Sequence, residues 1–130
     1  MYELKIITDF SAAHNLRNFR GKCESLHGHN WKVEVVVGGS RLDDSGVVVD
    51  FAEIKSLTRE VIAEIDHRYL NELPFFTQHN PSSENIARYI FQRLSEKIND
   101  NRVWVSRVTA WESQDACATY IAESVESDIQ

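Results

Sequence analysis

The spacing of apolar residues changes twice along the 130-residue chain, and this pattern limits the fold most strongly. Near both ends, as in residues 2–7 and 103–111, apolar and β-branched residues partly alternate with polar ones, which favours strands. Between the ends, over 51–65 and 86–98, apolar residues recur every three or four positions, which is typical of helices packed on one side. With a last apolar segment at 117–121, the sequence predicts the element order ββααββ.

This order indicates the α+β class, with a four-stranded antiparallel sheet and two helices on one of its faces. The second strand is expected at 31–37, followed by a turn at Gly38-Gly39. Such a sheet leaves two edges unpaired, and further copies of the chain can close them. Because no linker or repeat interrupts the sequence, we expect one domain over residues 1–130.

The helix ends carry capping signals. Asp50 predicts the N-cap of the first helix, with Glu53 as the other half of a capping box. For the second helix two alternatives stay open: Asn80 caps it with Pro81 at the first helical position, or one of the two serines that follow does. Residues 99–101 predict its end.

Composition excludes several classes of protein. Lys and Arg total 14 against 20 Asp and Glu, a net charge of −6, which disfavours general nucleic-acid binding. No apolar run approaches the ~20 residues of a membrane span, and the first residues lack the apolar centre of a signal peptide. Two cysteines, Cys23 and Cys117, are too few for a disulfide framework. We therefore expect a soluble cytoplasmic protein that binds neither membrane nor nucleic acid.

Three of the five histidines point to a metal site. His27 and His29 form a His-Gly-His motif directly before the second strand, so both imidazoles lie on one face. His14 ends the first expected strand and comes close to them if the two strands pair. Three neutral imidazoles suit zinc and leave a fourth position for water or substrate. The alternative is three histidines without a metal.

The segment between His14 and His27 holds further candidates. Cys23 is an inert thiol, a base or a fourth metal ligand, and its position does not separate these roles. Arg17, Arg20 and Lys22 form either a solvated loop or an anion site for substrate phosphates.

Two carboxylates outside this segment have alternatives of the same kind. Asp66-His67 is typical of a proton-transfer pair, or His67 interacts with the dipole at the end of the first helix. Glu112, after a strand, is solvated or accepts two hydrogen bonds from a guanidine-like edge of a ligand.

The chain resembles the 6-pyruvoyltetrahydropterin synthase and 6-carboxytetrahydropterin synthase family from Phe10 to about Tyr120. Five motifs occur in family order and with compatible spacing: Phe10-Ser11-Ala12-Ala13-His14, Cys23-x-x-x-His27-Gly28-His29, Asp66-His67, Pro81-Ser82-Ser83-Glu84-Asn85 and Trp111-Glu112-Ser113. The resemblance implies the tunnelling fold, in which ββααββ units assemble so that their sheets form a barrel. It further implies a homo-oligomer, commonly a trimer stacked into a hexamer, with active sites between subunits.

The resemblance also implies roles for individual residues. The implied ligands of Zn²⁺ are His14, His27 and His29. The residues implied to move protons are Cys23, Asp66 and His67. Implied substrate contacts come from Glu112, which would anchor the pterin, and from Ser82 and Ser83, which would line the pocket.

The implied enzyme is a lyase, and its implied substrate is 7,8-dihydroneopterin triphosphate. The compact spacing from Cys23 to His27 favours conversion to 6-carboxy-5,6,7,8-tetrahydropterin with release of acetaldehyde and triphosphate, a step toward queuosine and related 7-deazapurines. The pyruvoyl product is an alternative. Glu24 opens another, because E-x-x-H-G-H resembles members that cleave the substrate to 6-hydroxymethyl-7,8-dihydropterin for folate; otherwise Glu24 is a solvated loop residue. A non-catalytic pterin or purine binder of the same fold is the third alternative.

Overall fold

The computed structural model describes residues 1–123, so residues 124–130 of the expected 1–130 domain lie outside the described part. Its strands are β1 (Tyr2–His14), β2 (His27–Gly39), β3 (Arg68–Tyr69), β4 (Val103–Trp111) and β5 (Cys117–Ile121). Its helices are α1 (Phe51–Ile62), α2 (Pro74–Gln78) and α3 (Ser83–Ile98), with a short 3-10 helix η1 (Leu70–Glu72) before α2. The expected α+β order is confirmed, and β3, η1 and α2 are added between the two long helices.

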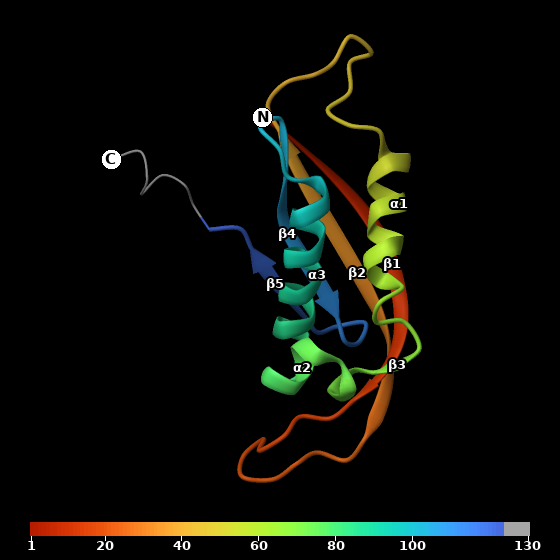
Figure 1. The fold of residues 1–130 in the computed structure, drawn as a ribbon, viewed down its shortest axis with the longest axis vertical. Helices are drawn as coiled ribbons and strands as arrows, with labels where there is room; N and C mark the ends of the chain where they lie inside the picture. The colour runs from red at the N-terminus through yellow and green to blue at the C-terminus, as the bar shows by residue number, and fades with distance from the viewer. Residues whose placement is uncertain (124–130) are drawn as a thin grey trace, which may run out of the picture.

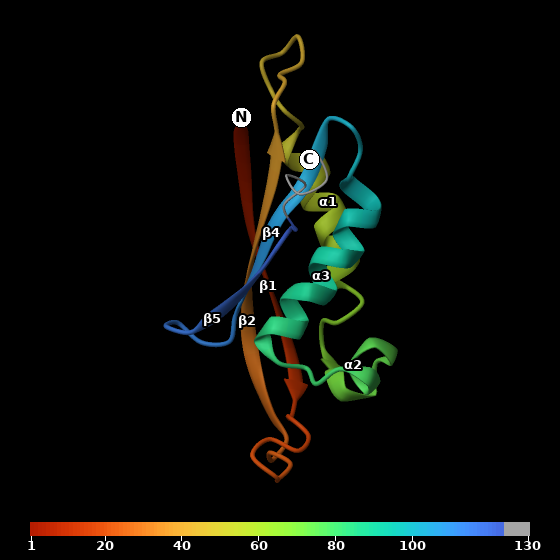
Figure 2. The same cartoon turned by 90° about the vertical axis from the view of Figure 1, so that its left-hand side faces the viewer.

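The strands form one sheet in the order β3-β1-β2-β4-β5, and α1 and α3 lie side by side on one of its faces (Figure 1). Figure 2 shows the other face without a covering helix. The expected four antiparallel strands are present, but the strand count was wrong by one. β3 pairs in parallel with β1, with Ala12 opposite Arg68. A strand of two residues is too short to leave a period in the sequence, so only the tertiary pairing shows it.

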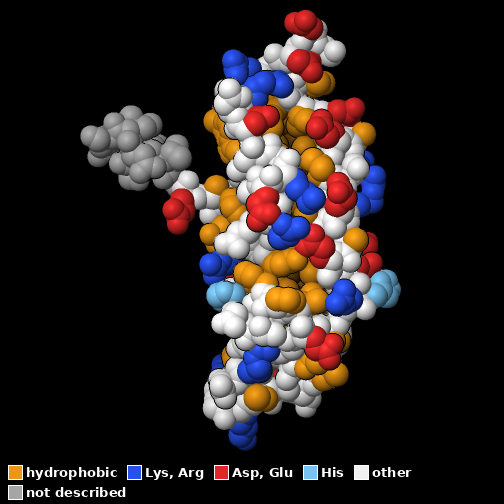
Figure 3. Space-filling view, viewed as in Figure 1, with side chains coloured by type: hydrophobic (Ala, Val, Ile, Leu, Met, Phe, Trp, Pro, Cys, Tyr) orange, Lys and Arg blue, Asp and Glu red, His pale blue; other side chains and the backbone are white. Residues whose placement is uncertain are grey.

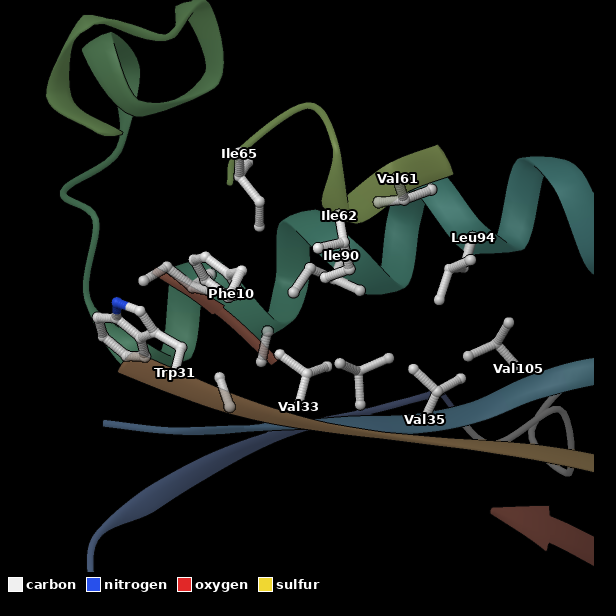
Figure 4. Packing of buried hydrophobic residues seen from close by; sticks show 14 of the residues in the cluster. Phe10, Trp31, Val33, Val35, Val61, Ile62, Ile65, Ile90, Leu94 and Val105 are labelled. Carbon is white, nitrogen blue, oxygen red and sulfur yellow. The ribbon is translucent and has the colours of Figure 1, made fainter. Parts of the chain in front are cut away.

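Strands β1 and β2 form a long antiparallel hairpin that runs from Tyr2 opposite Gly39 to His14 opposite His27. Alternate residues of both strands turn toward the helices, as strand geometry requires. These residues pack against apolar side chains of α1 and α3 and build the core (Figure 4). Its fully buried members include Trp31, Val33, Ile90 and Leu94.

The predicted caps Asp50 and Ser82 are confirmed, whereas among the described residues Glu53 makes no side-chain hydrogen bond that would complete the predicted capping box. Asp50 accepts a hydrogen bond from the backbone of Ala52 at the start of α1, and Ser82 accepts one from Asn85 at the start of α3. Ser82 is therefore the N-cap of α3, and α3 ends at Ile98 as expected. The apolar stripe predicted for the first helix was wrong at both ends. Phe51 is half exposed, and Ile65 is buried but lies beyond the end of α1.

The turn predicted at Gly38-Gly39 was wrong, because β2 continues through both residues. The glycines instead allow close approach of neighbouring side chains. A Cβ on Gly38 would lie 2.8 Å from Nε1 of Trp104, and one on Gly39 would lie 2.5 Å from Cγ1 of Val48. These positions need the absence of a side chain rather than a turn conformation.

The surface over the helices mixes basic and acidic side chains, with apolar side chains between them (Figure 3). No basic patch stands out on this face, as the net charge of −6 suggests. Among the described residues, each helix is too short or too polar to cross a membrane.

Candidate metal and active site

The hairpin brings the three predicted histidines together. His14 stands opposite His27 in the strand register, and His29 follows two residues later on the same face. The ring centroid of His14 lies 4.6 Å from that of His27 and 5.2 Å from that of His29. Glu112, just after β4, joins them, and one potential ligand atom from each of the four residues lies within 4.8 Å of all the others. The predicted imidazole cluster therefore exists within a single chain.

Backbone carbonyls orient two of these imidazoles. Nδ1 of His14 lies 2.6 Å from the carbonyl oxygen of Pro81, and Nδ1 of His27 lies 2.8 Å from that of Ser25. Since a carbonyl can only accept, each Nδ1 donates, and Nε2 is the nitrogen that presents a lone pair when such a ring is neutral. This is the arrangement by which proteins usually prepare a histidine for a metal.

The Nε2 atoms of His14 and His29 are buried and have no hydrogen-bond partner among the described residues. Buried polar atoms without a partner are rare, and each calls for an explanation such as an ion. Burial is the largest cause that lowers the pKa of His29, and the pull of Glu112 in the other direction does not reverse it. A neutral imidazole is the form that binds metal, so the donor set fits a divalent cation.

Trp31 forms a wall of the cluster. Its indole is fully buried and meets the rings of His14 and His29 edge to face, at centroid distances of 5.2 Å and 5.4 Å. On its other side it stacks on Phe10. The indole therefore restricts the orientations open to two of the three imidazoles.

The loop between β1 and β2 is held by polar contacts and carries Cys23 in an exposed position. The Glu24 carboxylate accepts a hydrogen bond from the backbone of Leu16, and the backbone of Glu24 donates to the carbonyl of Leu16. Among the described residues, Cys23 is outside the group of close ligand atoms, where Glu112 stands instead. The fourth position of the cluster is thus next to a carboxylate.

Arg17 has a structural contact that its sequence does not reveal. Its guanidinium donates to the carbonyl of Phe76 in α2, and its backbone exchanges two hydrogen bonds with the side chain of Asn80. This fixes the loop to the segment before α3. Of the three cations considered for an anion site, Arg20 and Lys22 remain exposed.

Asp66 and His67 form the expected pair. Nδ1 of His67 lies 3.0 Å from the Asp66 carboxylate, which also accepts a hydrogen bond from the backbone of Ser11. The Ser11 hydrogen bond, followed by the contact with His67, holds the pKa of Asp66 below its ordinary value. His67 adopts a φ of 59°, which is uncommon outside glycine and often marks functional positions.

His67 is 81% exposed and borders a shallow cavity of about 510 Å³. The residues that line it are Ser11, Ala12, Ala13, Gly28, His29, Asn30, His67, Arg68 and Tyr69. Ser11, Ala13 and Asn30 alternate with the cluster residues along β1 and β2 and face the other side of the sheet, whereas His29 belongs to the cluster itself. In the described part of the chain, the cavity beside His67 therefore reaches one cluster residue, His29, but not His14, His27 or Glu112.

Ser82 and Ser83 begin α3 directly after Pro81, whose carbonyl meets His14. This neighbourhood brings both serines to the cluster end of the molecule. A larger cavity of about 730 Å³ lies at the opposite end, between the start of β1 and the start of α1, and its lining contains none of the predicted site residues. The chemistry, rather than the size of the hollow, identifies the candidate site.

Residues 3–123 match the family model described as 6-pyruvoyl tetrahydropterin synthase. The chain belongs to this family. It is accordingly an enzyme of a lyase-type family that acts on pterins, and the expected family membership is confirmed.

Relatives within the 6-pyruvoyl tetrahydropterin synthase family carry different names. A putative 6-carboxy-5,6,7,8-tetrahydropterin synthase of Archaeoglobus fulgidus is 44% identical over 102 residues, covering 78% of this chain and 84% of that protein. The 6-carboxy-5,6,7,8-tetrahydropterin synthase of Haemophilus influenzae is 30% identical and covers 92% of this chain and 99% of its own length. A dihydroneopterin monophosphate aldolase of Pyrococcus furiosus is 36% identical over 82% of this chain and 85% of that protein.

The fold agrees with a solved family member. The structure of Caenorhabditis elegans 6-pyruvoyl tetrahydropterin synthase superposes with a TM-score of 0.81 at 27% identity, covering 94% of this chain and 96% of that chain. The expected tunnelling fold of the subunit is thereby confirmed.

Sequence reasoning missed three features of this family site. The carbonyls of Pro81 and Ser25 orient histidines, but backbone groups leave no trace in residue types. Trp31 was assigned only to a strand, although its place two residues after His29 puts it on the cluster face. Glu112 was expected at the pterin, and the contact with His14 and His29 depends on pairing of β4 with β2.

Proposed function

We propose that this enzyme converts 7,8-dihydroneopterin triphosphate to 6-carboxy-5,6,7,8-tetrahydropterin, with release of acetaldehyde and triphosphate, as a step toward queuosine and related 7-deazapurines. The observation that carries the proposal is the cluster of His14, His27 and His29, whose lone pairs converge beside Glu112. Relatives named 6-carboxy-5,6,7,8-tetrahydropterin synthase at 44% and 30% identity support the product.

The proposed ligands of Zn²⁺ are His14, His27 and His29. When bound there, zinc supplies Lewis acidity that makes the side-chain hydroxyls of the substrate easier to deprotonate. Cys23, as thiolate, removes one proton from the substrate side chain. His67, oriented by the Asp66 carboxylate 3.0 Å away, removes or returns another.

The remaining proposed roles concern the pterin ring. Glu112 accepts hydrogen bonds from the amino and N–H edge of the pterin, and Ser82 and Ser83 line the pocket beside it. Glu112 can accept two such bonds because a carboxylate matches a guanidine-like edge.

We propose that the active enzyme is a homo-oligomer, built on a trimer, with sites between subunits. Among the described residues, the cavity beside His67 is lined by His29 but not by His14, His27 or Glu112, which supports a site that combines residues from two copies. β1 also pairs with β3 only at Ala12 and Ala13, which leaves the rest of this edge available to a second copy. We place the enzyme in the cytoplasm, where its free cysteines stay reduced.

The test is product analysis by liquid chromatography and mass spectrometry. Zinc-loaded wild type, Cys23→Ala and Cys117→Ala are incubated with 7,8-dihydroneopterin triphosphate. Both cysteines are free and exposed, so Cys117→Ala controls for loss of a surface thiol. We expect carboxytetrahydropterin and acetaldehyde from wild type and Cys117→Ala but not from Cys23→Ala. Absence of both products from wild type would contradict the proposal.

A second candidate is aldolase cleavage to 6-hydroxymethyl-7,8-dihydropterin. It is favoured by the 36% identical relative named dihydroneopterin monophosphate aldolase and by Glu24, which is next to Cys23. In this reading, hydroxymethyldihydropterin persists in Cys23→Ala and disappears in Glu24→Ala. The hydrogen bond from Leu16 to the Glu24 carboxylate offers the competing structural role, which Glu24→Gln tests because it keeps an acceptor.

A further inference from the structure

We propose that Glu112 is the fourth protein ligand of the metal in the free enzyme and that it leaves this position when the pterin binds. The inference rests on metal binding by the three histidines proposed above. It starts from one oxygen atom: Oε1 of Glu112 lies 3.4 Å from Nε2 of His14 and 3.2 Å from Nε2 of His29.

These contacts are not ordinary hydrogen bonds. Nδ1 of His14 is already engaged with the carbonyl of Pro81, so Nε2 is the ring nitrogen left to face the carboxylate. Neither Nε2 has a hydrogen-bond partner of acceptable geometry among the described residues. Buried nitrogen atoms without a partner call for an explanation, and a bound ion is one. A divalent metal shared by Glu112 and the imidazoles gives both Nε2 atoms a partner.

The spacing agrees with shared coordination. Zinc bonds of about 2.0–2.1 Å meeting at tetrahedral angles place neighbouring ligand atoms about 3.3 Å apart. The two contacts of Glu112 measure 3.2 Å and 3.4 Å and use the same oxygen, as a carboxylate with one coordinating oxygen requires.

The backbone of Glu112 is held by a hydrogen bond, whereas its carboxylate is partly exposed. Its backbone N–H donates to the carbonyl of Ala116 across the turn between β4 and β5, whereas its side chain is 38% exposed. The carboxylate can therefore rotate away without moving β4. His14, which is 2% exposed, has no such freedom.

One Glu112 side chain cannot bind the metal and hold the pterin ring at the same time. The hydroxyls that would approach the metal and the amino edge that Glu112 would hold are at opposite ends of the bicyclic pterin. Release of the carboxylate opens the fourth position and frees the same side chain for the ring.

Co²⁺ reports on this exchange, because its visible absorption depends strongly on the number and type of its ligands. The experiment compares wild type, Glu112→Gln and the control Glu60→Gln. Glu60 is an exposed residue of α1 that contacts Lys97 of α3, so the control removes the same charge away from the cluster. The absorption of each Co²⁺-loaded protein is recorded, and zinc affinity is measured by competition with a chromophoric chelator.

We expect Glu112→Gln to change the cobalt spectrum and to weaken zinc binding roughly tenfold or more, since even partners of metal ligands alter affinity about 10–100-fold. Glu60→Gln should match wild type. A spectrum and affinity of Glu112→Gln equal to wild type would overturn the inference and leave an imidazolium–carboxylate pair as the explanation. If wild type binds neither Co²⁺ nor Zn²⁺, the proposed function fails too. If wild type binds metal and Glu112→Gln is identical to it, only the inference about Glu112 fails.

A second measurement tests the exchange itself. Saturating neopterin, an unreactive pterin with the same side-chain hydroxyls, is added to each Co²⁺ protein. The wild-type and Glu112→Gln spectra should then converge, because the carboxylate no longer contributes. A difference that persists at saturation would show that Glu112 stays on the metal and would overturn the release step.

Discussion

The imidazole of His14 is tied to the start of α3 through the carbonyl oxygen of Pro81, which lies 2.6 Å from its Nδ1. One bond therefore links the end of β1 to the segment before α3. Because the other face of the ring belongs to the metal cluster, His14 contributes to both folding and the site, whereas the half-buried His27 contributes mainly to the site.

The variant His14→Ala should destabilise the metal-free protein more than His27→Ala. Removing His14 leaves the buried carbonyl of Pro81 without a donor, which costs about 1–3 kcal/mol. The His27 substitution should cost only about 0.5 kcal/mol, as changes near a surface do. Urea unfolding in the presence of a chelator measures both. Elemental analysis should show that both variants lose the roughly one zinc per chain that a single four-ligand site holds. Equal destabilisation would contradict the structural role of His14.

Metal binding should change the fluorescence of Trp31. Its indole lies 5.2 Å and 5.4 Å from two imidazoles of the cluster, centroid to centroid, so a bound cation alters its surroundings directly. Titration of the metal-free protein with Zn²⁺ should give a saturable change, which Trp31→Phe removes while the other two tryptophans remain. Bound zinc should also raise the melting temperature, because a ligand at a free concentration of 100 times Kd adds about 2.7 kcal/mol to the free energy of unfolding. A fluorescence change that survives in Trp31→Phe would assign it to another tryptophan.

The stability contributed by the ion pair between Glu64, in the turn after α1, and Arg93 of α3 should depend on pH. Arg93 donates to both oxygens of Glu64, and these bonds, with a smaller contribution from Tyr89, hold the pKa of Glu64 below its ordinary value of 4.5. A lowered carboxyl pKa stabilises the fold above that value, and this stability is lost as the pH falls through the lower folded-state pKa. Since both side chains are about a third exposed, we expect Glu64→Gln to cost about 1 kcal/mol at neutral pH.

The cost of Glu64→Gln should shrink in urea unfolding series taken to progressively lower pH below 4.5. The matched variant Glu60→Gln breaks only a 3.7 Å contact with Lys97 and should cost less. Burial and the Glu64 contact raise the pKa of Tyr89 to about 12, so Glu64→Gln should also lower the pKa of that phenol. A cost that stays constant with pH would show that the carboxylate charge is not involved.

The variant Gly39→Ala should destabilise the protein by overpacking. Its new Cβ would lie 2.5 Å from Cγ1 of Val48 and 3.3 Å from the carbonyl of Arg102, and such crowding costs about 1–3 kcal/mol. In the double variant with Val48→Ala the clashing methyl is absent, so the two costs should be less than additive in thermal or urea unfolding. Additive costs would mean that strain elsewhere, rather than this contact, is responsible.

The sequence alone determined the α+β order, the cap at Asp50 and the grouping of three histidines. For the second helix it left two alternatives, one of which included Ser82. These features are local: a period of two or of three to four residues, and a His-x-His spacing, follow from strand and helix geometry. A five-residue α2 and a two-residue β3 are too short for such a period, so the sequence could not show them.

Only the tertiary structure decided how distant groups meet. Glu112 reaches the imidazoles because β4 pairs with β2, and the Pro81 carbonyl reaches His14 because α3 packs on the sheet. The two glycines at the end of β2 are a further example. A Gly-Gly pair is typical both of a turn and of a position where a neighbour such as Val48 packs closely, and only the structure separates the two. Long-range contacts depend on how whole elements pack, and residue types along the chain do not record that packing.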